Sequence, residues 1–120
     1  MPKLLIVDDE IDVREFAKNF FKRRKIDVDT AANGEEALAK IQKDNPDLVI
    51  LDVRMEGMDG IEVLKRVRQS GNKTDVIMVT GVSEKESMDK ANELGVIGYI
   101  HKPLILDELE QVVMKRLLKK

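Results

Sequence analysis

Five short apolar segments alternate along the chain with longer segments in which apolar and charged residues recur at helical spacing. Alternation of this kind is typical of a parallel sheet whose strands are joined by crossover helices. Most of the apolar segments are nearly continuous, as expected of strands buried on both faces, whereas the second contains alternating polar residues and is predicted to be an edge strand. The predicted strands are residues 3–7, 27–31, 47–51, 75–79 and 96–100.

A repeated start signal marks the five predicted helices. An Asp, Asn or Ser is followed three residues later by Glu, which is the spacing of a capping box at the amino terminus of a helix. The pairs are Asp12 and Glu15, Asn33 and Glu36, Asp59 and Glu62, Ser83 and Glu86, and Asp107 and Glu110. Five such starts at regular intervals predict a βα repeat that forms a single domain over residues 1–120.

The first and last predicted helices have apolar stripes that we expect to face the sheet. The stripe of the first helix consists of Val13, Phe16, Ala17, Phe20 and Phe21. The stripe of the last helix is less regular and consists of Leu109, Val112, Val113, Arg116 and Leu117.

Composition narrows the possible classes of protein. Aromatic residues make up 3% of the 120 residues, so the core is predicted to be aliphatic. The absence of cysteine excludes disulfides, thiolate metal sites and cysteine nucleophiles, and we expect a cytoplasmic protein. A net charge of -2 gives no general attraction to nucleic acid, and the apolar segment near the amino terminus is too short to insert into a membrane.

Three acidic residues are not explained as helix caps or surface charges. Asp8 and Asp9 follow the first predicted strand, and Asp52 follows the third. Ligands of open α/β sheets bind at the carboxyl ends of the strands, and right-handed crossovers place the first and third strands side by side. The three carboxylates should therefore converge and repel one another unless a cation joins them. Mg²⁺ suits such a site because one or two carboxylates, waters and a phosphate usually hold it.

The ends of the other strands provide groups that could bind a phosphoryl group. Thr80 and Gly81 follow the fourth predicted strand, and Lys102 and Pro103 follow the fifth. An acceptor carboxylate, metal-binding carboxylates, a hydroxyl and an ammonium at one edge of a sheet indicate phosphoryl transfer, in which catalysis is mainly positioning and neutralisation of charge.

Four sequence motifs resemble those of one family: "IVDDE" at residues 6–10, "LVILDVRM" with the "GMDG" that follows it, "MVTG" at residues 78–81 and "GYIHKP" at residues 98–103. Their order and spacing resemble the receiver domain of bacterial two-component response regulators, over about residues 3–118. The resemblance implies a flavodoxin-like, doubly wound sheet of five parallel strands in the order 2-1-3-4-5 with five helices.

The resemblance also implies roles for individual residues. Asp52 would accept a phosphoryl group from a histidine kinase or a histidine phosphotransfer protein. Asp9, Asp52 and the backbone carbonyl of Arg54 would bind Mg²⁺, or Mn²⁺ in its place, and Asp8 would reach the metal largely through water. Thr80 and Lys102 would contact phosphoryl oxygens.

Signalling would depend on a change in shape that follows phosphorylation. By the same resemblance Tyr99 would be the rotating aromatic residue of a switch with Thr80, and the Lys102–Pro103 peptide bond would be cis. The fourth helix, fifth strand and fifth helix would then present an altered face to a downstream protein. We expect a monomer or weak dimer that is not an enzyme beyond promoting its own phosphorylation and dephosphorylation.

By its alternation with Tyr99, His101 is expected to be an exposed residue rather than a ligand.

Some positions depart from the family pattern or favour other classes. Glu56 stands where the family usually has Pro, and Gly81 where a small Ala is common, while Arg54 and Val82 border the site at variable positions. One alternative is a pseudo-receiver that only docks. A second, less favoured alternative is a haloacid-dehalogenase-like phosphohydrolase, which needs a second Asp where this chain has Arg54. The closing "RLLKK" favours a stand-alone receiver over a piece of a longer regulator.

Overall fold

The computed structural model describes residues 1–81 and 85–118 of the chain. Its five strands and five helices alternate in the order β1 (Lys3–Val7), α1 (Ile11–Lys22), β2 (Asp27–Ala31), α2 (Gly34–Asp44), β3 (Leu48–Asp52), α3 (Gly60–Gln69), β4 (Asp75–Thr80), α4 (Lys85–Glu93), β5 (Gly98–His101) and α5 (Leu106–Leu117). The strands form one parallel sheet in the order β2-β1-β3-β4-β5, so the predicted fold class and strand order are confirmed.

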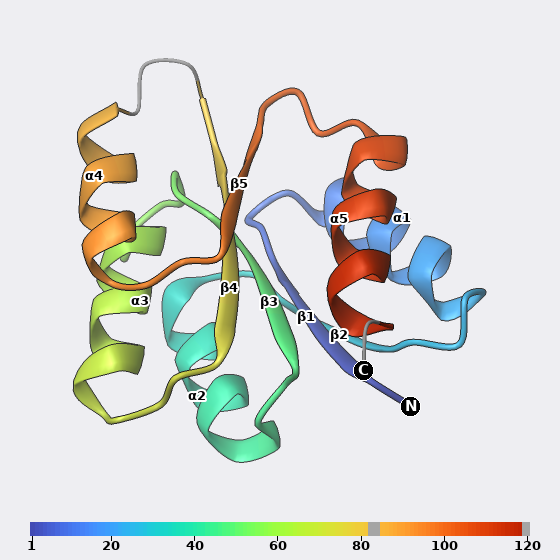
Figure 1. The fold of residues 1–120 in the computed structure, drawn as a ribbon, viewed down its shortest axis with the longest axis horizontal. Helices are drawn as coiled ribbons and strands as arrows, with labels where there is room; N and C mark the ends of the chain where they lie inside the picture. The colour runs from blue at the N-terminus through green and yellow to red at the C-terminus, as the bar shows by residue number, and fades with distance from the viewer. Residues whose placement is uncertain (82–84, 119–120) are drawn as a thin grey trace.

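Helices cover both faces of this sheet, with α1 and α5 on one face and α2, α3 and α4 on the other (Figure 1). Alternate residues of the central strands point to opposite faces, so each layer has its own apolar core. Under α1 and α5 the core includes Ile6, Ile50 and Val79, and under the other three helices it includes Val7, Leu51 and Met78. This double burial explains why the central strands are continuously apolar in the sequence.

The strand ends differ slightly from the prediction. β3 includes Asp52 and β4 includes Thr80, so both predicted site residues are the last residues of their strands. β5 begins at Gly98 rather than at residue 96, because the chain turns after α4 through Gly95, whose φ is +77°. The polar second strand lies at an edge of the sheet as predicted.

Two of the predicted helix caps are confirmed. The side chains of Asn33 and Asp59 accept hydrogen bonds from the backbone N–H groups of Glu36 and Glu62. The predicted cap at Ser83 lies outside the described residues.

The predicted caps at Asp12 and Asp107 are wrong, because α1 begins at Ile11 and α5 at Leu106. The carboxylate of Asp8 accepts the N–H of Glu10, which turns the chain into α1 earlier than the pattern implied. At α5 the first helical residue is Leu106, which packs against the core under α1 and α5. Both Asp residues lie in the first turn of their helices, where a negative charge still interacts favourably with the helix dipole.

The stripe predicted on the first helix is only partly correct. Ala17 and Phe21 are buried and Val13 and Phe20 are partly buried, but Phe16 is 60% exposed. Successive helix residues differ by about 100°, so a helix that centres Ala17 and Phe21 on the sheet turns Phe16 toward solvent. On α5 the buried residues are Leu109, Val113 and Leu117.

Among the described residues, no helix is long and apolar enough to cross a membrane.

Candidate functional site

The centre of the site is the carboxylate of Asp52 at the end of β3. The residue is 2% exposed, because β3 lies between β1 and β4 in the sheet. Its Oδ1 lies 3.0 Å from Nζ of Lys102 and accepts a hydrogen bond of 3.1 Å from the N–H of Arg54. Lys102 reaches it from the loop after β5, at a separation of 50 residues in the chain. The structure therefore brings together two residues that were predicted separately from strand-end positions.

Asp8 and Asp9 follow β1, beside β3. The backbone N–H of Asp8 donates to the carbonyl of Ala31, and its side chain accepts the N–H of Glu10 at 2.9 Å. Asp8 is 8% exposed, whereas Asp9 is exposed. The acids thus sit at the border between the core and solvent, where charge is weakly screened.

A glycine keeps the loop after Asp52 tightly packed. The N–H of Gly60, the first residue of α3, donates to the carbonyl of Val53 at 2.9 Å. An added Cβ at Gly60 would lie 2.2 Å from the carbonyl oxygen of Asp52, which no side chain could tolerate without displacing the backbone. This close approach explains the second glycine of the "GMDG" motif.

The electrostatics show a shortage of positive charge. Burial raises the pKa of Asp8 to about 6, and the charges of Asp52 and Asp9 add to the rise. Burial also raises the pKa of Asp52, although its hydrogen bond with Lys102 opposes the shift. Burial tends to lower the pKa of Lys102, but the hydrogen bond and charge of Asp52 outweigh it, so that pKa is raised. One ammonium is thus shared among several carboxylates that favour a further cation.

The oxygen ligands fit a hard divalent cation. One carboxylate oxygen from each of Asp8, Asp9 and Glu10 lies within 4.8 Å of the others. Carboxylate oxygens near a partly buried, under-neutralised Asp are the ligands that Mg²⁺ takes in proteins. Glu10 was not predicted as part of this cluster. The third letter of "DDE" was the available signal, but its position at the start of α1 gave no reason to separate it from surface acids.

The remaining predicted groups lie on the neighbouring strands. Thr80, the last residue of β4, is fully buried, and its hydroxyl donates to the carbonyl of Gly81 at 3.2 Å. The backbone N–H of Lys102 donates to the carbonyl of Thr80 at 2.8 Å, which ties the loop after β5 to the end of β4. The Lys102–Pro103 peptide bond is cis.

Comparisons with known proteins identify the family. Residues 4–114 match the response regulator receiver domain. The chain belongs to the response regulator receiver domain family. This receiver domain is 38% identical over 115 residues to the sporulation initiation phosphotransferase F of Bacillus subtilis, covering 96% of this chain and 93% of that protein. It is also 38% identical over 115 residues to the regulatory protein AtoC of Escherichia coli, but it spans only 25% of that longer protein.

Solved structures give the same fold. The chemotaxis protein CheY4 of Vibrio cholerae is 34% identical and superposes with a TM-score of 0.88, covering 98% of this receiver domain and 99% of that chain. A CheY-like receiver domain protein of Methanospirillum hungatei is 28% identical with a TM-score of 0.91, covering 99% and 95%.

The loop beside the acids forms one wall of an open cleft. The cleft runs between this loop and α4 and is lined by Asp9, Arg54, Glu56, Asp59 and Ser87, among others. Glu56 is exposed in the wall of this cleft. Its carboxylate adds negative charge to the solvent side of the acidic site.

Tyr99 lies on the edge strand β5 and is partly buried. Its ring packs against the core under α2, α3 and α4, and its hydroxyl donates to the carbonyl of Met88 at 2.9 Å. His101, two residues further along β5, is exposed as predicted.

Proposed function

We propose that this receiver domain accepts a phosphoryl group on Asp52 from a histidine kinase or a histidine phosphotransfer protein. The observation that supports this most strongly is the carboxylate of Asp52, which is 3% exposed at the end of β3 and paired at 3.0 Å with the Lys102 ammonium. A carboxylate oxygen of Asp52 attacks the phosphorus atom and forms an acyl phosphate. The bond between phosphorus and the donor's imidazole nitrogen breaks, and its electron pair stays on that nitrogen.

Asp8, Asp9, Asp52 and the backbone carbonyl of Arg54 would hold Mg²⁺, or Mn²⁺ in its place. When bound, the cation supplies positive charge that neutralises the carboxylates and the phosphoryl oxygens. The three acids contribute about -3 and Lys102 about +1, so a divalent ion brings the unmodified site close to neutrality.

Phosphorylation then disturbs this balance by adding about one negative charge and new acceptor oxygens. The Lys102 ammonium, already beside Asp52, can donate to one of these oxygens. The Thr80 hydroxyl can reach another only by giving up its bond to the carbonyl of Gly81. That movement frees space behind β4 into which Tyr99 turns, and it couples the site to the surface formed by α4, β5 and α5.

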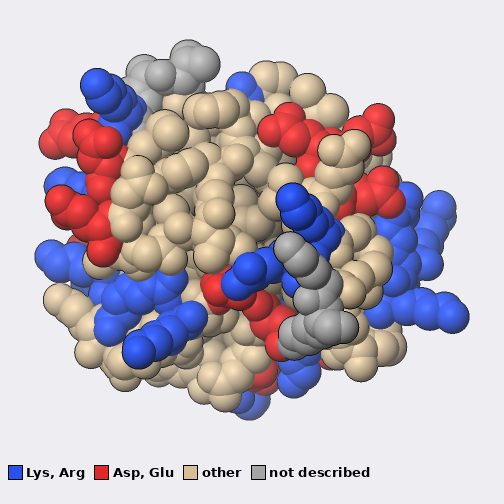
Figure 2. Space-filling view, viewed as in Figure 1, with Lys and Arg blue, Asp and Glu red and all other residues tan. Residues whose placement is uncertain are grey.

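A downstream protein would bind this surface. Figure 2 shows that few charged side chains lie at the centre of the face over β5, and that Asp and Glu side chains flank it. Ile97, just before β5, is 41% exposed, and Ile105, just before α5, is 53% exposed. A protein with a mainly apolar surface, rather than nucleic acid, is the partner that fits such a face. We expect a cytoplasmic monomer or weak dimer that acts through protein contacts.

Incubation with Mg²⁺ and acetyl phosphate, followed by intact-mass measurement, tests the proposed function. We expect a transient adduct of about 80 Da in the wild type and none in Asp52→Asn. Asp75→Asn, at the opposite end of the sheet, is the matched control and should be labelled like the wild type. Absence of the adduct from the wild type would favour the pseudo-receiver alternative, and steady hydrolysis of phosphate esters would favour a phosphohydrolase.

A further inference from the structure

The hydroxyl of Tyr99 is held by two groups of α4. It donates to the backbone carbonyl of Met88 and also contacts the side-chain oxygen of Asn92. Burial raises the pKa of the Tyr99 phenol, and the nearby charge of Asp89 adds to the shift, so the hydroxyl stays protonated and can donate. The ring is therefore fixed against the helix rather than free in solvent.

The positions of these two groups follow from helix geometry. Residues 88 and 92 are four apart, so they lie one above the other on the same face of α4. A hydroxyl has one proton, which it can give to only one acceptor at a time, but the Asn92 amide can either accept that proton or turn and donate to the phenol oxygen. Met88 and Asn92 together can thus satisfy both the donor and the acceptor capacity of Tyr99.

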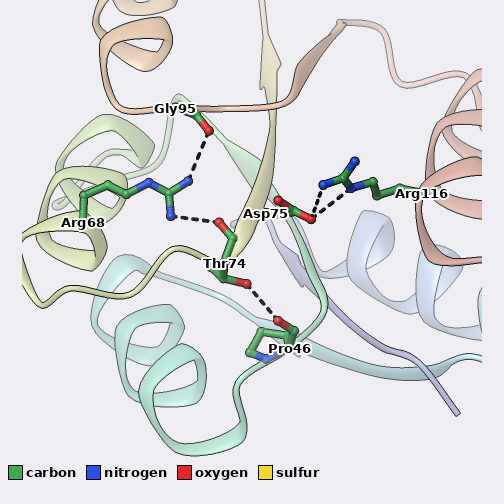
Figure 3. A network of polar contacts seen from close by, with 6 residues as sticks. All are labelled: Pro46, Arg68, Thr74, Asp75, Gly95 and Arg116. Atoms are coloured by element: carbon green, nitrogen blue, oxygen red, sulfur yellow. Dashed lines mark hydrogen bonds and ion pairs between the residues drawn. The ribbon is translucent and has the colours of Figure 1, made fainter. Parts of the chain in front are cut away.

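The part of α4 that holds Tyr99 is anchored from behind. Nε of Arg68, on α3, donates to the carbonyl of Leu94 at 2.7 Å, directly after the end of α4. The same guanidinium reaches the carbonyls of Gly95 and Thr74 (Figure 3). Asn92 lies two residues before Leu94, so the hydrogen bond from Arg68 to Leu94 helps to fix the backbone position of Asn92.

We propose that Asn92 is a positioning residue that holds the Tyr99 ring in the position seen here, against α4, which we call outward, and so sets how much of the unmodified protein is in the switched form. The proposal rests on the proposed role of Tyr99 as the moving aromatic residue. Loss of one such hydrogen bond changes an equilibrium by roughly fivefold, which is enough to alter the response of a two-state switch.

Tyr99 is the only tyrosine of the chain and there is no tryptophan, so a single fluorine label reports its position. Protein grown with 3-fluorotyrosine would be compared by ¹⁹F NMR as wild type, Asn92→Ala, Asn92→Asp and Glu93→Ala, all without phosphorylation. We expect Asn92→Ala to raise the ratio of inward to outward ring roughly fivefold, seen as a second signal or a population-weighted shift. Asn92→Asp keeps an acceptor oxygen but loses the amide donor, so it should restore the wild-type signal only in part. Glu93→Ala, the next exposed residue on α4, should leave it unchanged.

Two results would overturn the proposal: a wild-type signal in Asn92→Ala, or equal changes in Asn92→Ala and Glu93→Ala, which would show only a general effect on α4. Because the spectra are recorded on the unmodified protein, they do not depend on Asp52 being the acceptor. Intact-mass labelling of the same variants with acetyl phosphate is read separately. Failure of labelling in every protein would reject the proposed function and not the contact between Asn92 and Tyr99.

Discussion

At the carboxyl end of the sheet, the ammonium of Lys102 pairs with Asp52 and is near Asp8 and Asp9, and burial raises the pKa values of Asp8 and Asp52. At the amino end, polar groups are matched closely. Arg68 donates to four backbone carbonyls, those of Asn72, Thr74, Leu94 and Gly95. Arg116 of α5 donates two hydrogen bonds, of 2.6 and 2.9 Å, to the carboxylate of Asp75 (Figure 3).

The difference separates stability from function. At the amino end the polar groups already have hydrogen-bond partners, so a new ligand would add no stability there. These contacts can instead fix the helices relative to the sheet. An end with excess negative charge is destabilised by its own repulsion and is stabilised when a cation arrives. Changes at the two ends should therefore have opposite effects on folding and on phosphorylation.

The largest expected effect is that of Asp9→Ala. Because Asp9 is one of the proposed metal ligands, its loss should weaken Mg²⁺ binding by about 100-fold or more and reduce labelling in parallel. The free energy of unfolding without metal should stay the same or rise slightly, since one of three repelling charges is gone. Mg²⁺ titration and urea denaturation of the same protein measure both quantities. A large loss of stability would mean that Asp9 has a structural role.

Arg68→Ala should show the opposite pattern. Removing the guanidinium leaves several turn carbonyls without their donor, and we expect a loss of about 2 kcal/mol in the free energy of unfolding, measured in urea. Labelling by acetyl phosphate should stay within about twofold of the wild type, because the acids are untouched. Arg66→Ala is the control: its ion pair with Glu62 is exposed to solvent, so its loss should leave the free energy of unfolding almost unchanged.

A smaller effect is expected from pH in the metal-free protein. The pKa of Asp8 is about 6 in the folded state against an ordinary value of 3.8, so the folded protein binds its proton more tightly than the unfolded chain does. The stability that protonated Asp8 contributes is fully present below about pH 4 and is lost as the pH rises through about 6. Asp8→Asn should therefore be more stable than the wild type at pH 7, by about 1 kcal/mol after allowance for solvent screening, and the difference should vanish at pH 4. Urea midpoints at several pH values measure this, and a difference that is independent of pH would contradict it.

The sequence predicts the parts of the molecule that depend on a regular spacing of apolar residues or on the position of a residue at the end of a strand. Apolar runs predict the strands, and because parallel strands end at one edge of the sheet, the sequence alone predicts that Asp8, Asp52, Thr80 and Lys102 lie together. The same reasoning did not reach Phe16, whose exposure depends on how α1 rotates when it packs beside α5.

The arginine anchors at the amino end were not predictable for a different reason. Arg68 binds backbone carbonyls of two separate turns, and such groups leave no mark in the sequence because every residue has a carbonyl. The contact between Asn92 and Tyr99 was missed likewise, since it depends on the distance between α4 and β5. Helix caps were predicted correctly only where the local pattern met no competing contact, as at Asn33 and Asp59.

Locating the phosphoryl group tests most directly whether Asp52 is the acceptor. Protein labelled with acetyl phosphate and Mg²⁺ would be treated with borohydride, which reduces an acyl phosphate and converts the modified Asp to homoserine, and then digested for peptide mass spectrometry. We expect homoserine at position 52 alone, and none when Mg²⁺ is removed. Homoserine at position 8 or 9, or at any other Asp, would contradict the claim that the buried, Lys102-paired carboxylate of Asp52 is the acceptor.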